Sequence, residues 1–167
     1  MRKLFIFTTF FFSGLIYSQS NLDSKGVLKG LEKEEWIMID RILSYSNADS
    51  ISKITPIDLL RYLITGTADS ESDIKLIKYT IPKSWITKEN VTQLMPFVYA
   101  KKKSRQIQSI MSSFASPKNS TIGLEAMHLI NLYRNQNYNY PELCFLCHSK
   151  KTQNEMADDY SSWWKAQ

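Results

Sequence analysis

The chain has few of the residues on which several protein classes depend. Its 167 residues include two cysteines, two histidines, five glycines and five prolines. So few cysteines exclude a disulfide-dense miniprotein, and so little glycine and proline excludes a fibrous repeat. Because 43% of the residues are hydrophobic, intrinsic disorder is also excluded. A chain of this length and composition predicts one compact domain.

The sequence has no apolar run as long as a membrane-spanning helix requires, and its longest run stands near the start. Residues 4–17 are almost all apolar; two basic residues precede them and a small polar stretch, 18–20, follows. These are the three parts of a secretory signal peptide, whereas a spanning helix needs about 20 apolar residues. We therefore expect residues 1–18 to be a signal peptide, with cleavage after residue 18 or residue 20. The mature chain, 19–167, is expected to be periplasmic or extracellular and to have no membrane span.

The excess of basic residues is small in the expected mature chain. The net charge of +5 falls to +3 when Arg2 and Lys3 are removed with the signal peptide. The remaining basic runs, residues 101–105 and 150–151, are expected in solvated turns, and the aromatic residues recur at core spacings. A nucleic-acid surface needs basic residues interleaved with exposed aromatics along one face. The sequence therefore predicts no nucleic-acid partner.

Hydrophobic residues recur with helical periodicity, and strict alternation over the length of a strand is hard to find. Each segment has one apolar stripe, which must be buried against neighbouring helices. We therefore predict a single all-α domain of six to seven helices, as an irregular bundle or as stacked helical hairpins. The pair within 87–116 is the most hairpin-like unit, and Pro96 predicts a kink or an early end in its first helix. The expected helices cover residues 22–45, 55–66, 74–81, 87–98, 107–114, 120–134 and 152–164.

Residues that cap helices mark several of these starts. Thr55, Thr87 and Ser120 are expected to accept hydrogen bonds from the first turns of their helices. Thr152 and Glu155 form the Thr-x-x-Glu pattern of a capping box. These local signals predict helix starts at four places in the chain.

One motif carries recognisable chemistry, the sequence Cys144-Phe-Leu-Cys147-His148. Its spacing matches the attachment site of c-type haem, in which two thiols bond the porphyrin and the histidine is an axial iron ligand. The motif resembles that of the class II cytochromes c, but here it lies between turns, with a further helix after it. The alternative is a local disulfide between Cys144 and Cys147, or a buried thiol, with no cofactor. We adopt the disulfide interpretation and keep haem as the alternative.

Other chemistry has little support in the sequence. A zinc site is disfavoured because His128 is the only other histidine and no further cysteine exists. The motifs G-x-S-x-G and H-E-x-x-H of hydrolases are both absent. His128 is expected on a helix surface and the carboxylate pairs in exposed positions. We predict no metal site and no catalytic residues, so an enzyme is disfavoured.

Residues 120–126 read Ser-Thr-Ile-Gly-Leu-Glu-Ala, and Tyr133-Arg134, Tyr140-Pro141, Cys144 and Trp163-Trp164 follow. This pattern resembles a family of small exported bacterial helical proteins with the same helix start, Tyr-Arg helix end, Tyr-Pro turn, cysteine and Trp-Trp pair. The resemblance implies that these residues form one structural unit, and it implies no activity. It also speaks against haem, because the family pattern keeps the first cysteine without the full Cys-x-x-Cys-His.

The same residues have physical roles of their own. Gly123 has no side chain, so another backbone can approach the helix closely there. Glu125 is near the positive start of its helix and Arg134 near the negative end, where each complements the helix dipole. These residues therefore serve packing or contact a partner. The candidate structural or partner-contact residues are Ser120, Gly123, Glu125, Arg134, Trp163 and Trp164.

The sequence predicts an exported, non-enzymatic helical module that binds another protein in a groove between helices. An immunity protein that blocks a toxin delivered into the cell envelope is the concrete version. The alternative is a monohaem c-type cytochrome in electron transfer or gas binding, attached through Cys144 and Cys147 with His148 as the fifth ligand. The candidates for its sixth ligand are Met127, His128 and Met156.

Overall fold

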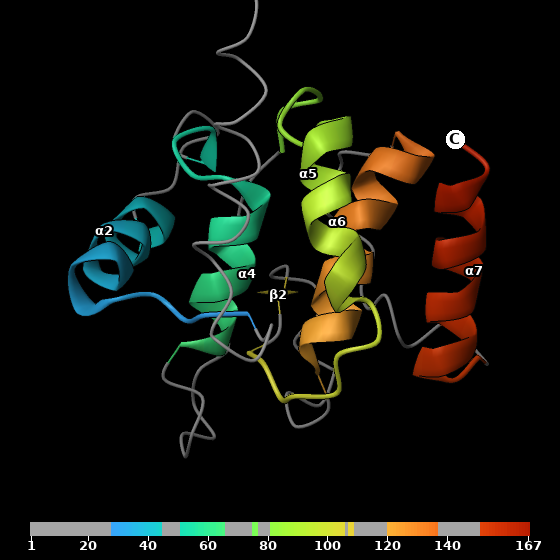
Figure 1. Ribbon diagram of the computed structural model, residues 1–167. Helices are drawn as coiled ribbons and strands as arrows, with labels where there is room; N and C mark the ends of the chain where they lie inside the picture. The colour runs from blue at the N-terminus through green and yellow to red at the C-terminus, as the bar shows by residue number, and fades with distance from the viewer. Residues whose placement is uncertain are drawn as a thin grey trace, which may run out of the picture. The chain divides into compact units, whose positions relative to one another are not determined.

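The computed structural model describes seven stretches of the chain: residues 28–44, 51–65, 75–76, 81–105, 107–108, 120–136 and 151–167. The chain divides into two units, residues 1–30 and 31–167, and all the named elements lie in the second unit. Figure 1 shows these elements along the chain. They are α2 (Lys33–Ser44), α4 (Pro56–Ile64), β1 (Lys75–Leu76), α5 (Lys88–Leu94), the 3-10 helix η1 (Met95–Phe97), β2 (Ile107–Gln108), α6 (Ile122–Asn135) and α7 (Gln153–Lys165).

The described residues form a predominantly helical fold, which confirms the all-α prediction. The described ranges hold five α-helices, against the six to seven that periodicity predicts. Two of the expected helices are wrong where the structure describes them, because residues 75–76 and 107–108 are strands. β1 and β2 pair in parallel, with Lys75 opposite Ile107. Short isoleucine-rich segments are compatible with a helix or with a strand, and here the pairing with a distant segment favours the strand.

The expected helical hairpin within 87–116 is therefore wrong in its second half, at residues 107–108. Its first half is confirmed. α5 ends at Leu94 and the chain continues as the 3-10 helix Met95–Phe97, with Pro96 inside it. Because proline has no N–H to donate, the α-helical hydrogen-bond ladder stops here, as predicted.

Most of the predicted helix starts are confirmed. Thr55 accepts a hydrogen bond from the third residue of α4, and both Thr87 and Thr152 form capping boxes. The prediction for Ser120 is wrong by one residue, because the side chain of Thr121 caps α6. The hydroxyl of Ser120 instead donates to a buried carboxylate further along that helix.

The first described helix begins later than the sequence predicts. Periodicity gives residues 22–45, whereas α2 covers Lys33–Ser44 and residues 29–32 are not helical. Gly30 stands just before this start, and glycine inside a helix costs about 1 kcal/mol relative to alanine. The backbone N–H of Leu31 donates to the hydroxyl of Thr65, at 2.8 Å, instead of joining a helical ladder.

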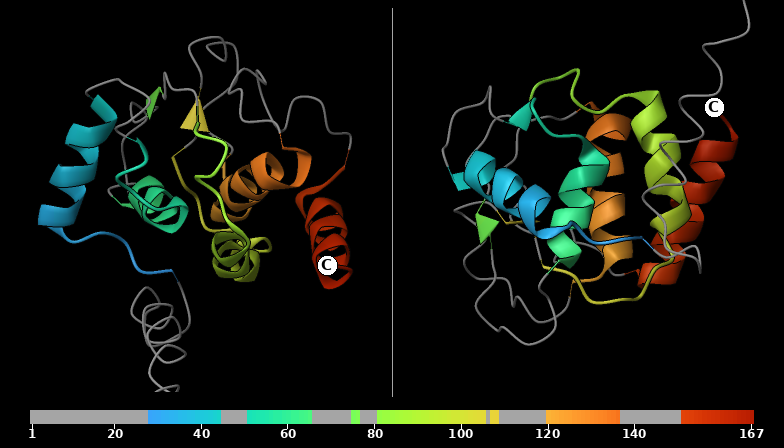
Figure 2. Two further views of the ribbon diagram at one scale, coloured as in Figure 1. Left: turned by 90° about the horizontal axis from the view of Figure 1, so that it is seen from above. Right: turned by 60° about the vertical axis from the view of Figure 1, so that its left-hand side comes forward.

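Helix α6 is the element around which the second unit packs. It contacts α4, α5, η1 and α7, while α2 packs against α4 (Figures 1 and 2). Almost every residue of α4 is buried, and α6 is buried along most of its length. Among the described residues, no helix combines the length and the apolar character needed to cross a membrane.

Helices α6 and α7 run in the same direction. Thr121 at the start of α6 donates to Gln153 at the start of α7, over 3.0 Å. Further along, Tyr160 donates to Asn131 over 2.9 Å. The two helices therefore bring their C-terminal ends together, and this end carries three of the candidate residues.

Candidate partner-binding surface

The start of α6 is locked to its neighbours by a close backbone approach at Gly123. Its N–H donates to the carbonyl oxygen of Ala100 over 2.9 Å. A Cβ atom at this position would lie 2.9 Å from that same oxygen and would collide with the carbonyl oxygen of Val98 and the side chain of Gln153. The predicted close approach at Gly123 is confirmed, and its role is structural.

Ser120 and Glu125 form a buried pair beside this contact. Both are 4% exposed, and the hydroxyl of Ser120 donates to the carboxylate of Glu125. The carboxylate lies in the first turn of α6, where the helix dipole favours negative charge. Because so little of either residue reaches solvent, they serve folding and offer no surface to a partner.

A second polar cluster, missed by sequence reasoning, closes the C-terminal end of α4. The prediction that Arg105 lies in a solvated turn is wrong, because Arg105 is only 6% exposed. Its guanidinium donates to the backbone carbonyls of Tyr62 and Thr65, the latter at 2.6 Å. Its cationic carbon lies 4.5 Å from the centre of the Tyr62 ring. Lys101, Lys102 and Lys103, in the same basic run, are exposed as expected.

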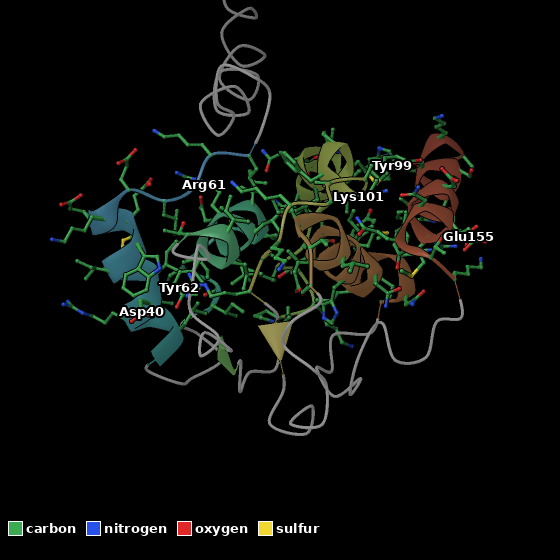
Figure 3. All side chains as sticks on the ribbon, turned by 90° about the horizontal axis from the view of Figure 1, so that it is seen from below. Asp40, Arg61, Tyr62, Tyr99, Lys101 and Glu155 are labelled. Atoms are coloured by element: carbon green, nitrogen blue, oxygen red, sulfur yellow. The ribbon has the colours of Figure 1, made fainter. Side chains whose placement is uncertain are left out.

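Tyr62 joins this cluster to α2. Its hydroxyl donates to Asp40 over 2.6 Å, and its ring stacks on Trp36 with the ring centres 5.9 Å apart. Figure 3 shows Tyr62 and Asp40 between α2 and α4. Burial, together with the hydrogen bond to Asp40, raises the pKa of the Tyr62 phenol above its ordinary value. This phenol therefore stays protonated and acts as a structural donor.

The shared end of α6 and α7 has a different character. The guanidinium carbon of Arg134 lies 5.2 Å from the ring centre of Tyr160 and 5.3 Å from that of Trp163. Trp163 also meets Tyr133 edge-on, with the ring centres 6.5 Å apart. The structure thus brings together two of the candidate residues, Arg134 of α6 and Trp163 of α7.

Trp164 extends this group toward α5. Its ring centre lies 5.7 Å from that of Trp163, and the ammonium of Lys88 stands 5.8 Å from the Trp164 ring. Both tryptophans are partly exposed, and Lys88 and Arg134 are exposed. We name these neighbouring residues the Arg134 surface: Lys88, Tyr133, Arg134, Trp163 and Trp164.

The electrostatics of this surface depend on how Arg134 is held. Within the described part of the chain, its guanidinium contacts the Tyr160 and Trp163 rings. Stacking leaves the N–H groups at the edge of the plane able to donate to carboxylate oxygens. Arg134 therefore lies against aromatic rings and is exposed to solvent, where its N–H groups can reach a partner.

The haem motif cannot be placed in this geometry. Cys144, Cys147 and His148 lie outside the described residues, so neither the disulfide nor haem attachment is tested. Of the three candidates for a sixth ligand, Met127 and Met156 are buried side chains of the helical core. His128, on α6, is partly buried, and burial lowers its pKa to about 4.

A cavity of about 300 Å³ lies between the starts of α4 and α5. Two of its polar lining residues are already engaged, since Thr55 bonds Asp58 and Asn90 bonds Thr87. In the part of the chain that the structure describes, no three His, Cys, Asp or Glu side chains gather as metal ligands would. The Arg134 surface is therefore the strongest candidate site.

Comparison with known proteins adds no assignment. No family model matches the chain, and comparisons with curated proteins and with solved structures gave no match. The resemblance to small exported bacterial helical proteins stays a prediction from the sequence pattern.

Proposed function

We propose that the protein is an exported, non-enzymatic helical module that binds a protein partner through the Arg134 surface. The observation that carries this proposal is the placement of Arg134 over two aromatic rings with its edge donors unused by the described residues. An immunity protein that neutralises a toxin in the cell envelope is one form of this function.

The composition of the Arg134 surface supports binding to a protein. Tryptophan, tyrosine and arginine are the residues most enriched where protein interfaces concentrate their binding energy. Here two tryptophans, a tyrosine and an arginine lie together and partly exposed. Because α6 and α7 hold these rings in contact with one another, little side-chain entropy is lost when a partner covers them.

The charge of the surface indicates the kind of partner. Lys88 and Arg134 stand at the aromatic rings, and the exposed Lys165 follows in the last turn of α7. We therefore propose that the partner presents carboxylates beside an apolar side chain. Arginine binds a carboxylate through two parallel N–H groups, which orients the partner as well as attracting it.

A site-specific crosslinking experiment tests this surface. A photoreactive residue replaces Lys88, at the edge of the Arg134 surface, and in a control replaces Lys53, an exposed residue near the start of α4. Both proteins are expressed from the full-length gene in their native cells and illuminated. We expect one acidic protein to crosslink at position 88 and not at position 53. Equal capture at both positions would contradict the proposal.

The captured protein is then purified and titrated by calorimetry. We expect R134Q and W163A each to weaken binding by about tenfold or more, as truncations of central interface residues do, while K53A changes it less than about twofold. Affinity should fall with added salt, because the proposed contacts are charged. Unchanged affinity of both R134Q and W163A would refute the site.

Export is tested by the mass of the mature protein. Protein recovered from outside the cytoplasm should lack residues 1–18 or 1–20, as the signal-peptide pattern predicts. The measured mass should not include that of a haem group. It should also be lower than the mass of the reduced chain by the two hydrogens lost when Cys144 and Cys147 form a disulfide. A haem absorption band that survives acidified-acetone extraction would favour the cytochrome alternative instead.

A further inference from the structure

A second surface, independent of the Arg134 surface, lies on the outer side of α2. This helix packs against α4 through Ile39 and Leu43, which are buried. On another face stand Ile37 and Met38, which are 42% and 54% exposed. Among the described residues only one other large hydrophobic side chain, Tyr99, is as exposed, and its hydroxyl is hydrogen-bonded to α7. The apolar pair on α2 has no polar atom that would gain from contact with water.

Two opposite charges flank this pair symmetrically. Glu34 stands three residues before Ile37, and Arg41 stands three residues after Met38. Residues at positions i, i+3, i+4 and i+7 share one helix face. The outer face of α2 therefore reads, in order, as an acid, two apolar residues and a base, and all four are exposed.

Within the described part of the chain, neither charge has a partner. Glu34 and Arg41 form no hydrogen bond or ion pair there, and seven residues of helix separate them by about 10.5 Å, too far to pair with each other. Glu35, on the adjacent side of the helix, behaves differently, since it bonds Arg61 across to α4 at 3.0 Å. The outer charges are thus available to another molecule.

A second copy of the same face satisfies all four residues. In an antiparallel pair related by a two-fold axis, each contact occurs twice with the residues exchanged. Placing the axis between Ile37 and Met38 sets Ile37 against Met38 of the other copy. It also sets Glu34 against Arg41 of the other copy, twice.

We infer that α2 binds a second copy of this chain through Glu34, Ile37, Met38 and Arg41, with the two helices antiparallel. A helix of 12 residues is about 18 Å long, so one such pair buries less than the roughly 1,200 Å² of a stable interface. The dimer is therefore weak, and its population rises with protein concentration.

Sedimentation of charge-reversal variants tests the inference, with protein purified after expression of the full-length gene. We expect wild-type protein to self-associate as its concentration rises toward the millimolar range. E34R and R41E should each weaken this association by about three- to tenfold, because each reversal acts twice in the dimer. An equimolar mixture of the two variants should associate more strongly than either variant alone, because both reversed charges then face opposite ones.

The mixture also separates pairing from helix stability. Glu34 in the first turn and Arg41 in the last turn favour the helix dipole in the monomer, so both reversals destabilise α2. Mixing cannot repair that loss, and circular dichroism shows whether each variant is folded. The variant R134A should dimerise as wild type does, since its surface is separate.

Three results would overturn the inference: wild-type protein that stays monomeric throughout the concentration range, single variants that associate as wild type does, or a mixture no stronger than its components. As a second probe, M38Q removes apolar contact at the axis without changing any charge. It should weaken association as well, and unchanged association of M38Q would count against the antiparallel arrangement.

Discussion

The two ends of α6 differ in their surroundings: the start is enclosed by neighbouring backbone, and the end lies at the surface. At the start, Gly123 meets two backbone carbonyl oxygens, and the buried Ser120–Glu125 pair excludes water. At the end, Arg134 contacts aromatic rings among the described residues and is exposed. The start of α6 therefore has no room for a larger side chain, whereas its end can exchange solvent contacts for those of a partner.

The largest expected effect is at the rigid end. G123A adds a methyl group that neighbouring backbone atoms cannot avoid, so we expect a loss of about 3 kcal/mol in the free energy of unfolding. At an uncrowded helix position the same change would stabilise the protein, because alanine is the better helix former. Urea denaturation measures the difference, with S162A on the exposed face of α7 as the control. A G123A protein as stable as wild type would mean that the close approach is absent.

A second expectation concerns His128, between the two ends. Burial lowers its folded pKa to about 4 from the ordinary 6.5, so the unfolded chain binds the proton more readily. The stability from this residue is complete above pH 6.5 and is lost as the pH falls toward 4. Allowing for partial exposure, the loss at pH 5 should be about 1 kcal/mol. Urea midpoints between pH 7 and pH 4 should fall less steeply for H128Q, and equal slopes would show that His128 does not titrate this way.

The smallest effect on stability is expected at the exposed end. R134A removes one exposed guanidinium from its two rings, and a cation–π interaction at an exposed site contributes as little as about 0.5 kcal/mol. Thermal and urea unfolding should therefore change little, while partner binding weakens by about tenfold or more. A loss as large as that of G123A would make Arg134 a structural residue and remove the contrast between the two ends.

Local signals in the sequence predict three helix starts correctly. Thr55, Thr87 and Thr152 mark starts that the structure confirms, because a capping hydroxyl acts on backbone groups only three residues away. The cap of α6 was misplaced by one residue because Ser120 and Thr121 both offer a hydroxyl. Deciding between them required knowing that a buried carboxylate would take the hydroxyl of Ser120.

Features that depend on distant parts of the chain could not be predicted in this way. The pairing of β1 with β2 joins segments about thirty residues apart, and each strand has only two residues. The burial of Arg105 depends on the end of α4, which its neighbours Lys101, Lys102 and Lys103 do not reveal. For the candidate site, the sequence named Arg134, Trp163 and Trp164. It did not show that two parallel helices bring them together, nor that Lys88 and Tyr133 join them.

The burial of the Arg105 guanidinium affects the order in which parts of the chain can fold. The last carbonyl groups of a helix need donors from elsewhere, and for α4 one of these donors lies forty residues further along. During synthesis, α4 can form a helix, but the carbonyl groups at its C-terminal end stay hydrated until Arg105 has left the ribosome. The C-terminal end of α4 therefore reaches its native hydrogen bonding only after residue 105 has been synthesised.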